Sequence, residues 1–243
     1  YSTFLQRAYD QIVHDVCLQN LPVCILSDHV GLVGDDGKTH HGVLSVPMLM
    51  SIPNLTLLAP RDTRQIRQAV RATLKLDGPC VVQYPKEGIE PYAQNVTGEP
   101  FAVGKWQTLI PGGQDAVILA YGRMTQNAIQ ASELLVQRGL SVGVIDCCSL
   151  KPLDMDCLRA LFERKAKIVT IEEGEMIGGF GSEIARVCVE ENADAPVQII
   201  GLENRFITHG SVPELLRECG LTPEQLADRI EEIAGDKESS HVG

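Results

Sequence analysis

Apolar positions in the first half of the chain follow two patterns, a helical spacing and short continuous runs. In FLQRAYDQIVHDV, residues 4–16, the spacing of the apolar side chains predicts an amphipathic helix. LPVCILS, residues 21–27, and NLTLLAP, residues 54–60, are continuous apolar runs, typical of strands buried on both faces. A further helix is predicted at 61–75 and a third strand at 78–85. Because strands alternate with helices, we expect a parallel sheet.

The second half repeats this alternation. Strands are predicted in DAVILAYG, SVGVIDCCS, KIVTIEE and PVQIIGL, and helices in MTQNAIQASELLVQRG, LDMDCLRALFERK, GFGSEIARVCVEE, SVPELLREC and TPEQLADRIEEIA. Ser211 and Thr222 are predicted N-caps, because Glu214 and Gln225 follow three residues later, as in capping boxes.

Residues 86–115 separate the two halves. They are rich in proline and glycine and lack a sustained period, which is typical of a linker or an irregular strand region. We therefore predict an α/β protein of two domains, each a mostly parallel sheet flanked by helices. The predicted boundaries are a first domain at 1–95, a linker at 96–115, a second domain at 116–236 and a tail at 237–243 without a site.

Composition narrows the possible functions. The net charge of −11 disfavours a broad surface that neutralises phosphates, so no nucleic-acid partner is expected. The chain contains no apolar run of membrane-spanning length and no secretion leader, so we expect a cytoplasmic protein that does not enter a membrane. Because the chain begins with Tyr1 inside a helical pattern, we expect it to be part of a longer protein.

Eight cysteines lie mostly in apolar stretches and show no CxxC spacing. This pattern indicates neither a zinc site nor a disulfide framework. Small buried side chains in a reducing cytoplasm are the favoured interpretation.

The segment GLVGDDGKTHHG, residues 31–42, concentrates glycines, acids and histidines after a predicted strand. A calcium loop requires alternating oxygen ligands and a terminal bidentate acid, which this segment lacks. His40 and His41 point in opposite directions if extended, so one metal ion cannot easily bind both. Two interpretations stay open, a polar turn and a ligand-binding loop in which one histidine moves protons near neutral pH.

The glycine-rich turn GGFGSE, residues 178–183, could bind a dinucleotide phosphate or could simply begin a helix. It lacks the full spacing of a dinucleotide-binding turn and occurs late in the chain. We predict a helix N-terminus packed tightly against its strand, since the acids Glu172, Glu173 and Glu175 would repel a phosphate.

Several stretches together carry a resemblance to a known family. YSTFLQRAYDQIVHDVCLQNLPV, GLVGDDGKTHHG, IPNLTLLAPRD, GPCVVQYPKEG, SLKPLD, EEGEMIGGFGSE and FITHGSVPELLRECGL occur in the order seen in the 1-deoxy-D-xylulose-5-phosphate synthases, enzymes of the transketolase type. The chain resembles their C-terminal half, which is part of a pyrimidine-binding domain followed by the transketolase C-terminal domain. The resemblance covers nearly all of residues 1–235.

The resemblance implies an activity and its partners. The family condenses pyruvate with glyceraldehyde 3-phosphate and releases carbon dioxide, at the entry to isoprenoid synthesis and with a product that feeds thiamine and pyridoxal formation. Its cofactors are thiamine diphosphate and Mg²⁺, and a homodimer is implied. The cofactor carries the carbanion chemistry, and the protein supplies orientation and charge.

The resemblance also implies roles for individual residues. Phe4 matches the aromatic residue that stacks on the aminopyrimidine ring. Tyr1 and Arg7 match substrate-side residues, and a guanidinium suits phosphate. His40 matches the loop histidine near the reacting carbon, a proton shuttle or an orienter of the acceptor, and Asp36 matches the aspartate of the same loop.

Two positions depart from the family pattern. Asp28-His29-Val30-Gly31 stands where the family usually has Asp-Arg-Ala-Gly, and Lys86 stands where it usually has a phosphate-binding arginine. Lysine keeps the charge but not the planar fork, and a neutral histidine keeps neither. The resemblance therefore implies weaker phosphate binding or an altered acceptor.

Two parts of the family's cofactor site have no match. The chain contains no Gly-Asp-Gly segment followed by an asparagine-bearing loop, which anchors magnesium and diphosphate. The pyrimidine-domain glutamate lies upstream of Tyr1 in the family. We therefore expect the isolated chain to be inactive. The alternatives are another transketolase-like subunit, from a split transketolase or a 2-oxo acid dehydrogenase β subunit, and a non-catalytic dimerisation module.

Overall fold

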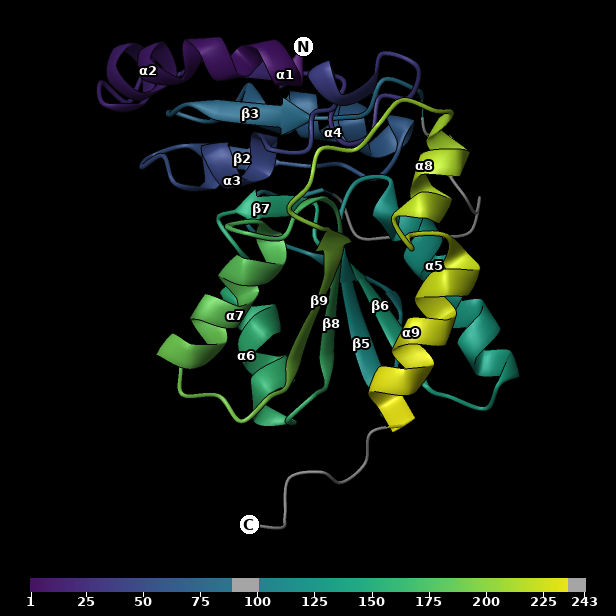
Figure 1. Ribbon diagram of the computed structural model, residues 1–243. Coiled ribbons are helices and arrows are strands. Elements are labelled where there is room, and N and C mark those ends of the chain that lie inside the picture. Colours follow the sequence, from purple (N-terminus) through teal and green to yellow (C-terminus); the bar gives the residue numbers. More distant parts are fainter. Residues whose placement is uncertain (89–100, 236–243) are drawn as a thin grey trace.

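The computed structural model describes residues 1–88 and 101–235 and contains two sheets (Figure 1). The first has the strand order β1-β3-β2-β7 and the second the order β4-β6-β5-β8-β9. Most neighbouring strands run parallel, and β4 and β7 run antiparallel to their partners. The predicted α/β class, with mostly parallel sheets flanked by helices, is confirmed.

The first sheet is built from short strands with helices between them. Its elements are β1 (Cys24–Ser27), β2 (Thr56–Leu58), β3 (Cys80–Gln83), β7 (Ser149–Lys151), α3 (Ser45–Met50) and α4 (Thr63–Thr73). The Asp62 side chain accepts a 2.7 Å hydrogen bond from the backbone N–H of Gln65, which caps α4 where the sequence predicts a helix.

The predicted helix at 4–16 is helical throughout but not uniformly α. It consists of α1 (Ser2–Leu5), a 3₁₀ turn at Gln6–Ala8, α2 (Tyr9–Gln11) and a π-helical turn at Ile12–Cys17. Ile12 and Cys17 are buried in the core, while Arg7 and Phe4 stay exposed. The exposed residues of this helix are therefore available for contacts with a ligand.

The expectation that residues 21–27 are buried on both faces is wrong. β1 is an edge strand, hydrogen-bonded within the described sheet to β3 alone. Cys24 is exposed, and Leu26 retains 50% exposure. An apolar run indicates strand propensity, but its position at an edge leaves one side of the strand open.

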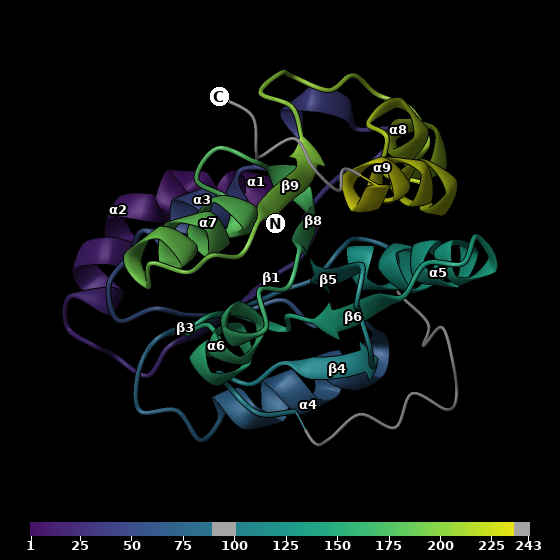
Figure 2. The same ribbon diagram turned by 90° about the horizontal axis from the view of Figure 1, so that it is seen from below.

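The second sheet forms the larger layer. Its elements are β4 (Gln107–Ile110), β5 (Ala116–Ala120), β6 (Val142–Asp146), β8 (Ile168–Glu175), β9 (Val197–Leu202), α5 (Met124–Gln137), α6 (Met155–Glu163), α7 (Phe180–Glu190), α8 (Val212–Glu218) and α9 (Pro223–Gly235). Helices α5 and α9 pack together on one face, and α7 lies on the other (Figure 2). β5, β6 and β8 are buried along their whole length, as continuous apolar runs predict.

One strand crosses between the two halves of the chain. β7 follows β6 in sequence but pairs antiparallel with β2 in the first sheet. The backbone N–H of Ala59 donates to the Cys148 carbonyl at 2.8 Å, and one hydrophobic core joins Leu57 of β2 to Val117 of β5 and Phe180 of α7. The two halves therefore share a core.

The described part of the segment predicted as a linker contains a β-strand. β4 lies within 96–115 and pairs antiparallel with β6. The side chain of Trp106 donates a 2.8 Å hydrogen bond to the Ser149 carbonyl. The expected boundary at residue 95 and the tail at 237–243 lie outside the described residues.

The turn GGFGSE is a packed helix start, as predicted. A Cβ on Gly181 would lie 2.4 Å from Thr170 Oγ1, so only glycine fits against the strand. The buried Glu172 carboxylate accepts hydrogen bonds from the backbone N–H groups of Phe180 and Gly181 at 3.0 and 2.9 Å. This carboxylate already occupies the anion-binding position at the start of α7.

The two predicted capping boxes are confirmed. Ser211 and Glu214 form a capping box, and Thr222 and Gln225 exchange the equivalent hydrogen bonds. All eight cysteines are free thiols, and most are buried. Among the described helices, none combines the length and the apolar character that crossing a membrane requires.

Candidate functional site

The loop at residues 31–42 is closed at its base by a short antiparallel bridge. Gly31 and Gly42 exchange backbone hydrogen bonds of 3.3 and 2.8 Å. Within the loop, Gly34 and Gly37 have φ values of +83° and +70°, which glycine adopts without strain. The loop is thus a defined turn, and it presents His40 on one side.

Four aromatic rings from three segments meet beside this loop. The Tyr1 ring stacks on His29 with centroids 3.9 Å apart. His40 lies edge-on to Phe4 at 5.4 Å and to Tyr1 at 5.7 Å. We call Tyr1, Phe4, His29 and His40 the ring cluster. The structure therefore brings together four of the residues that the family resemblance selects.

Hydrogen bonds to the helix start hold the ring cluster in place. Ser2 Oγ donates to the His29 carbonyl at 2.6 Å, and Thr3 Oγ1 donates to the His40 carbonyl. His29 has a φ of +57°, a strained conformation for a residue with a side chain, and the Ser2 contact helps to fix it.

The remaining predicted residues surround the ring cluster. The Arg7 guanidinium lies over the Phe4 ring at 5.3 Å, a cation–π contact. Lys86 Nζ lies 3.6 Å from Asp36 Oδ2, and both side chains are about half exposed. Burial raises the pKa of the Tyr1 hydroxyl, and the negative charge of nearby Asp36 raises it further.

The Tyr1 hydroxyl is a potential hydrogen-bonding group. Its oxygen is buried and lacks a hydrogen-bond partner among the described residues. Because burial and nearby carboxylates raise its pKa, the phenol stays protonated at neutral pH and can donate.

His41 has a structural role, unlike its neighbour. The residue is 6% exposed, Nδ1 accepts a 3.0 Å hydrogen bond from the backbone N–H of Val33, and Nε2 lies 2.9 Å from the Thr208 carbonyl. Because Nδ1 accepts, the proton lies on Nε2 and the ring is neutral. The two histidines therefore lie in different environments, although the backbone at His40 is not extended as that expectation assumed.

Two residues of the second half that sequence reasoning did not select also support the loop. The buried Glu173 carboxylate accepts a 2.8 Å hydrogen bond from the Leu32 N–H and pairs with Arg123 Nε at 3.1 Å. Both lie at the ends of strands, Arg123 shortly after β5 and Glu173 in β8. The position of acids at the carboxyl end of a parallel strand was the available signal.

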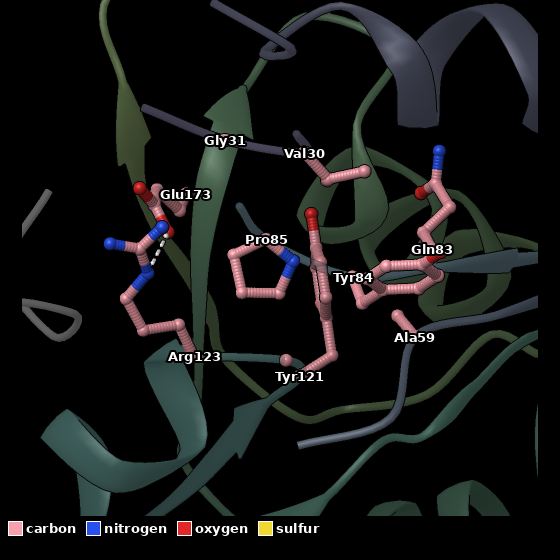
Figure 3. Close-up of a pocket in the computed structure, with 10 residues that line it drawn as sticks. Val30, Gly31, Ala59, Gln83, Tyr84, Pro85, Tyr121, Arg123 and Glu173 are labelled. Carbon is pink, nitrogen blue, oxygen red and sulfur yellow. Dashed lines mark ion pairs between the residues drawn. The ribbon is translucent and has the colours of Figure 1, made fainter. Parts of the chain in front are cut away.

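A small cavity of about 20 Å³ lies where the two halves meet (Figure 3). Arg123 and Glu173 face each other on one side of it, and Gln83 and Tyr84 lie on the other. The Gln83 amide is buried without a partner among the described residues. The volume suits one water molecule and not a substrate.

Larger grooves flank the loop at the surface. One of about 330 Å³ is lined by Asp36, Lys38 and His209 among others, and one of about 500 Å³ by Lys86 and Arg123 among others. Acidic side chains, among them Asp35 and Glu87, line the same grooves, so the open space beside the loop presents charges of both signs.

Comparison with known proteins identifies the family. Residues 104–226 match the family model of the transketolase C-terminal domain, and residues 1–90 match that of the transketolase pyrimidine binding domain. The chain belongs to the transketolase family. The resemblance to 1-deoxy-D-xylulose-5-phosphate synthases is confirmed by proteins of that name. The protein from Rippkaea orientalis is 40% identical over 235 residues, and that from Geobacillus thermodenitrificans is 42% identical over 240 residues.

These alignments cover 96% and 98% of the chain but only 37% and 38% of the two relatives, so the chain spans less than half of their length. Among solved structures of the transketolase family, a split-gene transketolase described as an inactive β4 tetramer is 29% identical. It has a TM-score of 0.86 and covers 98% of this chain and 76% of its own. A transketolase variant from Pichia stipitis, 18% identical with a TM-score of 0.76, covers 96% of this chain and 33% of its own and supports the fold alone.

Proposed function

We propose that this chain forms part of a thiamine diphosphate-dependent synthase that condenses pyruvate with glyceraldehyde 3-phosphate. The product is 1-deoxy-D-xylulose 5-phosphate, with release of carbon dioxide, and it supplies isoprenoid, thiamine and pyridoxal synthesis. The observation that carries the proposal is the ring cluster, in which His40 lies edge-on to the exposed Phe4 ring. The identity to synthases of this name supports the choice of substrates.

The residues present fit one end of the cofactor. Phe4 is 40% exposed and offers an aromatic ring suited to a flat heterocycle, and Tyr1, whose hydroxyl has no partner among the described residues, lies beside it. Thiamine diphosphate, when bound, supplies the carbanion-stabilising chemistry of the reaction. Among residues 1–88 and 101–235, no group of three potential ligands could hold a metal ion. We therefore assign the Mg²⁺ and diphosphate anchor to residues outside this set.

His40 is the proposed proton-handling group. Its ring is partly exposed beside Phe4, and Nδ1 lies 2.8 Å from Thr39 Oγ1. That contact orients the ring, which leaves Nε2 to exchange a proton with the substrate oxygen. The Tyr1 hydroxyl donates a hydrogen bond to the same ligand.

Positive side chains are proposed to bind the substrate phosphate. Arg7 offers a guanidinium fork, and Lys86 offers a point charge that Asp36 partly neutralises at 3.6 Å. His29 stacks on Tyr1 and lies 3.0 Å from Asp28, so it contributes ring packing where the related enzymes usually have an arginine. We therefore propose weaker phosphate binding than in those enzymes.

We further propose that the 243-residue chain alone is inactive, and that the active protein is a cytoplasmic homodimer. The lack of the anchor motif in this sequence and the 37% coverage of the relatives support the first point. The split-gene neighbour, itself described as a tetramer, supports self-association.

The decisive experiment follows carbon dioxide release from labelled pyruvate by the complete gene product. Release should require glyceraldehyde 3-phosphate, thiamine diphosphate and Mg²⁺ together. Release that is unchanged when any one of the three is omitted would disprove the proposed reaction. Static light scattering of the 243-residue chain separately tests the alternative that the chain is a non-catalytic dimerisation module. A chain that stays strictly monomeric at high concentration would exclude this alternative.

A split transketolase subunit is the second candidate function. The split-gene neighbour supports this candidate, because the similarity covers 98% of the present chain and 76% of the neighbour's own chain. The two candidates differ in the donor substrate, because a solved Pichia stipitis transketolase is described as a complex with the ketose phosphate sedoheptulose 7-phosphate. Turnover of such a ketose phosphate without pyruvate and without release of carbon dioxide would favour the second candidate.

A further inference from the structure

Two cysteines lie side by side on neighbouring strands at one edge of the first sheet, as the described residues form it. Cys24 of β1 and Cys80 of β3 are register partners in the parallel ladder. Neighbouring strands lie about 4.8 Å apart, and matched positions carry their side chains on the same face. This spacing falls within the range of roughly 4.4–6.8 Å between Cα atoms that a disulfide bond spans.

The two thiols converge on one hydroxyl group of α4. Cys24 Sγ donates a 3.3 Å hydrogen bond to Thr73 Oγ1. The Cys80 thiol interacts with the same two groups, since Cys24 helps to raise the pKa of Cys80 and Thr73 lowers it. Both thiols therefore lie near the Thr73 hydroxyl, on one face of the sheet.

The pair differs in exposure, which gives an oxidant access to one member. Cys24 lies on the edge strand and is exposed, whereas Cys80 is 1% exposed. By contrast, the adjacent Cys147 and Cys148 are buried, and burial raises the pKa of both thiols well above the ordinary value. Reactivity toward a bulky oxidant should therefore be concentrated at Cys24.

We propose that Cys24 and Cys80 form a reversible intramolecular disulfide when the protein meets a disulfide oxidant such as oxidised glutathione. The Cys24 thiolate attacks one sulfur of the oxidant and expels one glutathione. The Cys80 thiol then attacks Cys24 Sγ and releases the second glutathione, which takes up the Cys80 proton. Two protein thiols are oxidised and one glutathione disulfide is reduced to two thiols.

The order of events follows from the environment of Cys80. Burial, with the contribution of Cys24, raises the pKa of Cys80 to about 12, so this sulfur is a slow attacking group. The mixed disulfide at Cys24 is expected to form first and to decay into the internal bond. The bond would tie the open edge strand covalently to β3.

The test is oxidation of the folded chain with oxidised glutathione, alkylation of the remaining thiols, and peptide mass spectrometry without reduction. A peptide pair linked through Cys24 and Cys80 is expected, and dithiothreitol should reverse the link. Fragment spectra distinguish Cys24 from Cys17, a buried thiol seven residues earlier in the chain. Circular dichroism before and after oxidation verifies that the fold persists.

Three variants sharpen the assignment. Cys80→Ser should stop at a stable glutathione adduct on Cys24, Cys24→Ser should abolish both products, and Cys219→Ser should leave the link unchanged. Cys219 is a matched control because it is partly exposed but lies outside the sheet. The proposal fails if the parent chain keeps the glutathione adduct on Cys24 while Cys80 remains a free thiol that can be alkylated. It also fails if Cys24 does not react, or if the only disulfides that form join two separate chains.

Discussion

The carboxylate of Glu173 accepts a 2.8 Å hydrogen bond from the backbone N–H of Leu32. This contact joins the end of β8 in the second sheet to the base of the loop that carries His40. A Cβ on Gly31 would lie 2.6 Å from Glu173 Cδ, so the two groups are packed without spare room. The second half of the chain thus positions a loop that belongs to the first.

Replacing Gly31 with alanine tests this packing. Gly31→Ala should lower the free energy of unfolding by about 2 kcal/mol or more, because the φ of +79° is strained and the methyl group meets Glu173. Urea denaturation measures the change. Gly220→Ala is a matched control, with a φ of +70° but open space around the new methyl group, and should cost about 1 kcal/mol. Equal losses would show that only backbone strain matters.

The buried Glu172 should make stability depend on pH. Burial raises its pKa from 4.5 to about 7, against the effect of the two N–H groups of α7. The folded state therefore holds the proton more tightly, so this contribution is complete below about pH 4.5 and is lost as the pH rises through 7. The free energy of unfolding should fall by up to about 1.4 kcal/mol per pH unit in that window.

Glu172→Gln provides the comparison for this pH effect. The amide does not titrate, so the difference in unfolding free energy between parent and variant should change between pH 5 and pH 7. Denaturation curves at several pH values measure it. A constant difference across the window would mean that Glu172 titrates near its ordinary pKa.

Replacing His40 tests the proposed proton transfer in the complete gene product. His40→Ala should lower kcat by about 100-fold or more, since positioned acid–base groups contribute at least this much. Calorimetry should show little change in thiamine diphosphate affinity, because Phe4 and not His40 offers the stacking face. His14→Ala, in an exposed i,i+4 pair with Asp10, is the control. An unchanged kcat would rule out the assigned role.

Lys86 provides a test of phosphate recognition. Lys86→Arg should lower the KM for glyceraldehyde 3-phosphate about fivefold in the complete gene product, because a planar fork can form two hydrogen bonds. The KM for pyruvate should stay the same. Lys75→Arg, on an exposed segment after α4, should alter neither constant. A KM that rises or does not move would place the phosphate elsewhere.

Much of the fold could be predicted because strands buried on both faces have a recognisable composition. The runs at β5, β6 and the first part of β8 are largely apolar, and these strands are buried. The same argument failed at β1, since an apolar run does not reveal whether a strand lies at an edge. β7 also escaped prediction, because it is only three residues long and its pairing with β2 depends on a distant segment.

The candidate site was predictable to a similar extent. The seven residues chosen by resemblance lie around one loop, although their roles stay proposals. Glu173 and His41 were not chosen, because their contacts with Leu32, Val33 and Thr208 depend on how the chain folds around them. Such support comes from tertiary packing, which local spacing cannot show.

Because β7 pairs with β2, each half of the chain depends on the other for its stability. Cutting the chain between them would strip one sheet of its outermost strand and leave the β2 backbone open to association with other molecules. The remaining piece would also lose the shared apolar packing around Leu57. The protein should therefore melt in one cooperative step, and its halves should prove poorly soluble when produced separately.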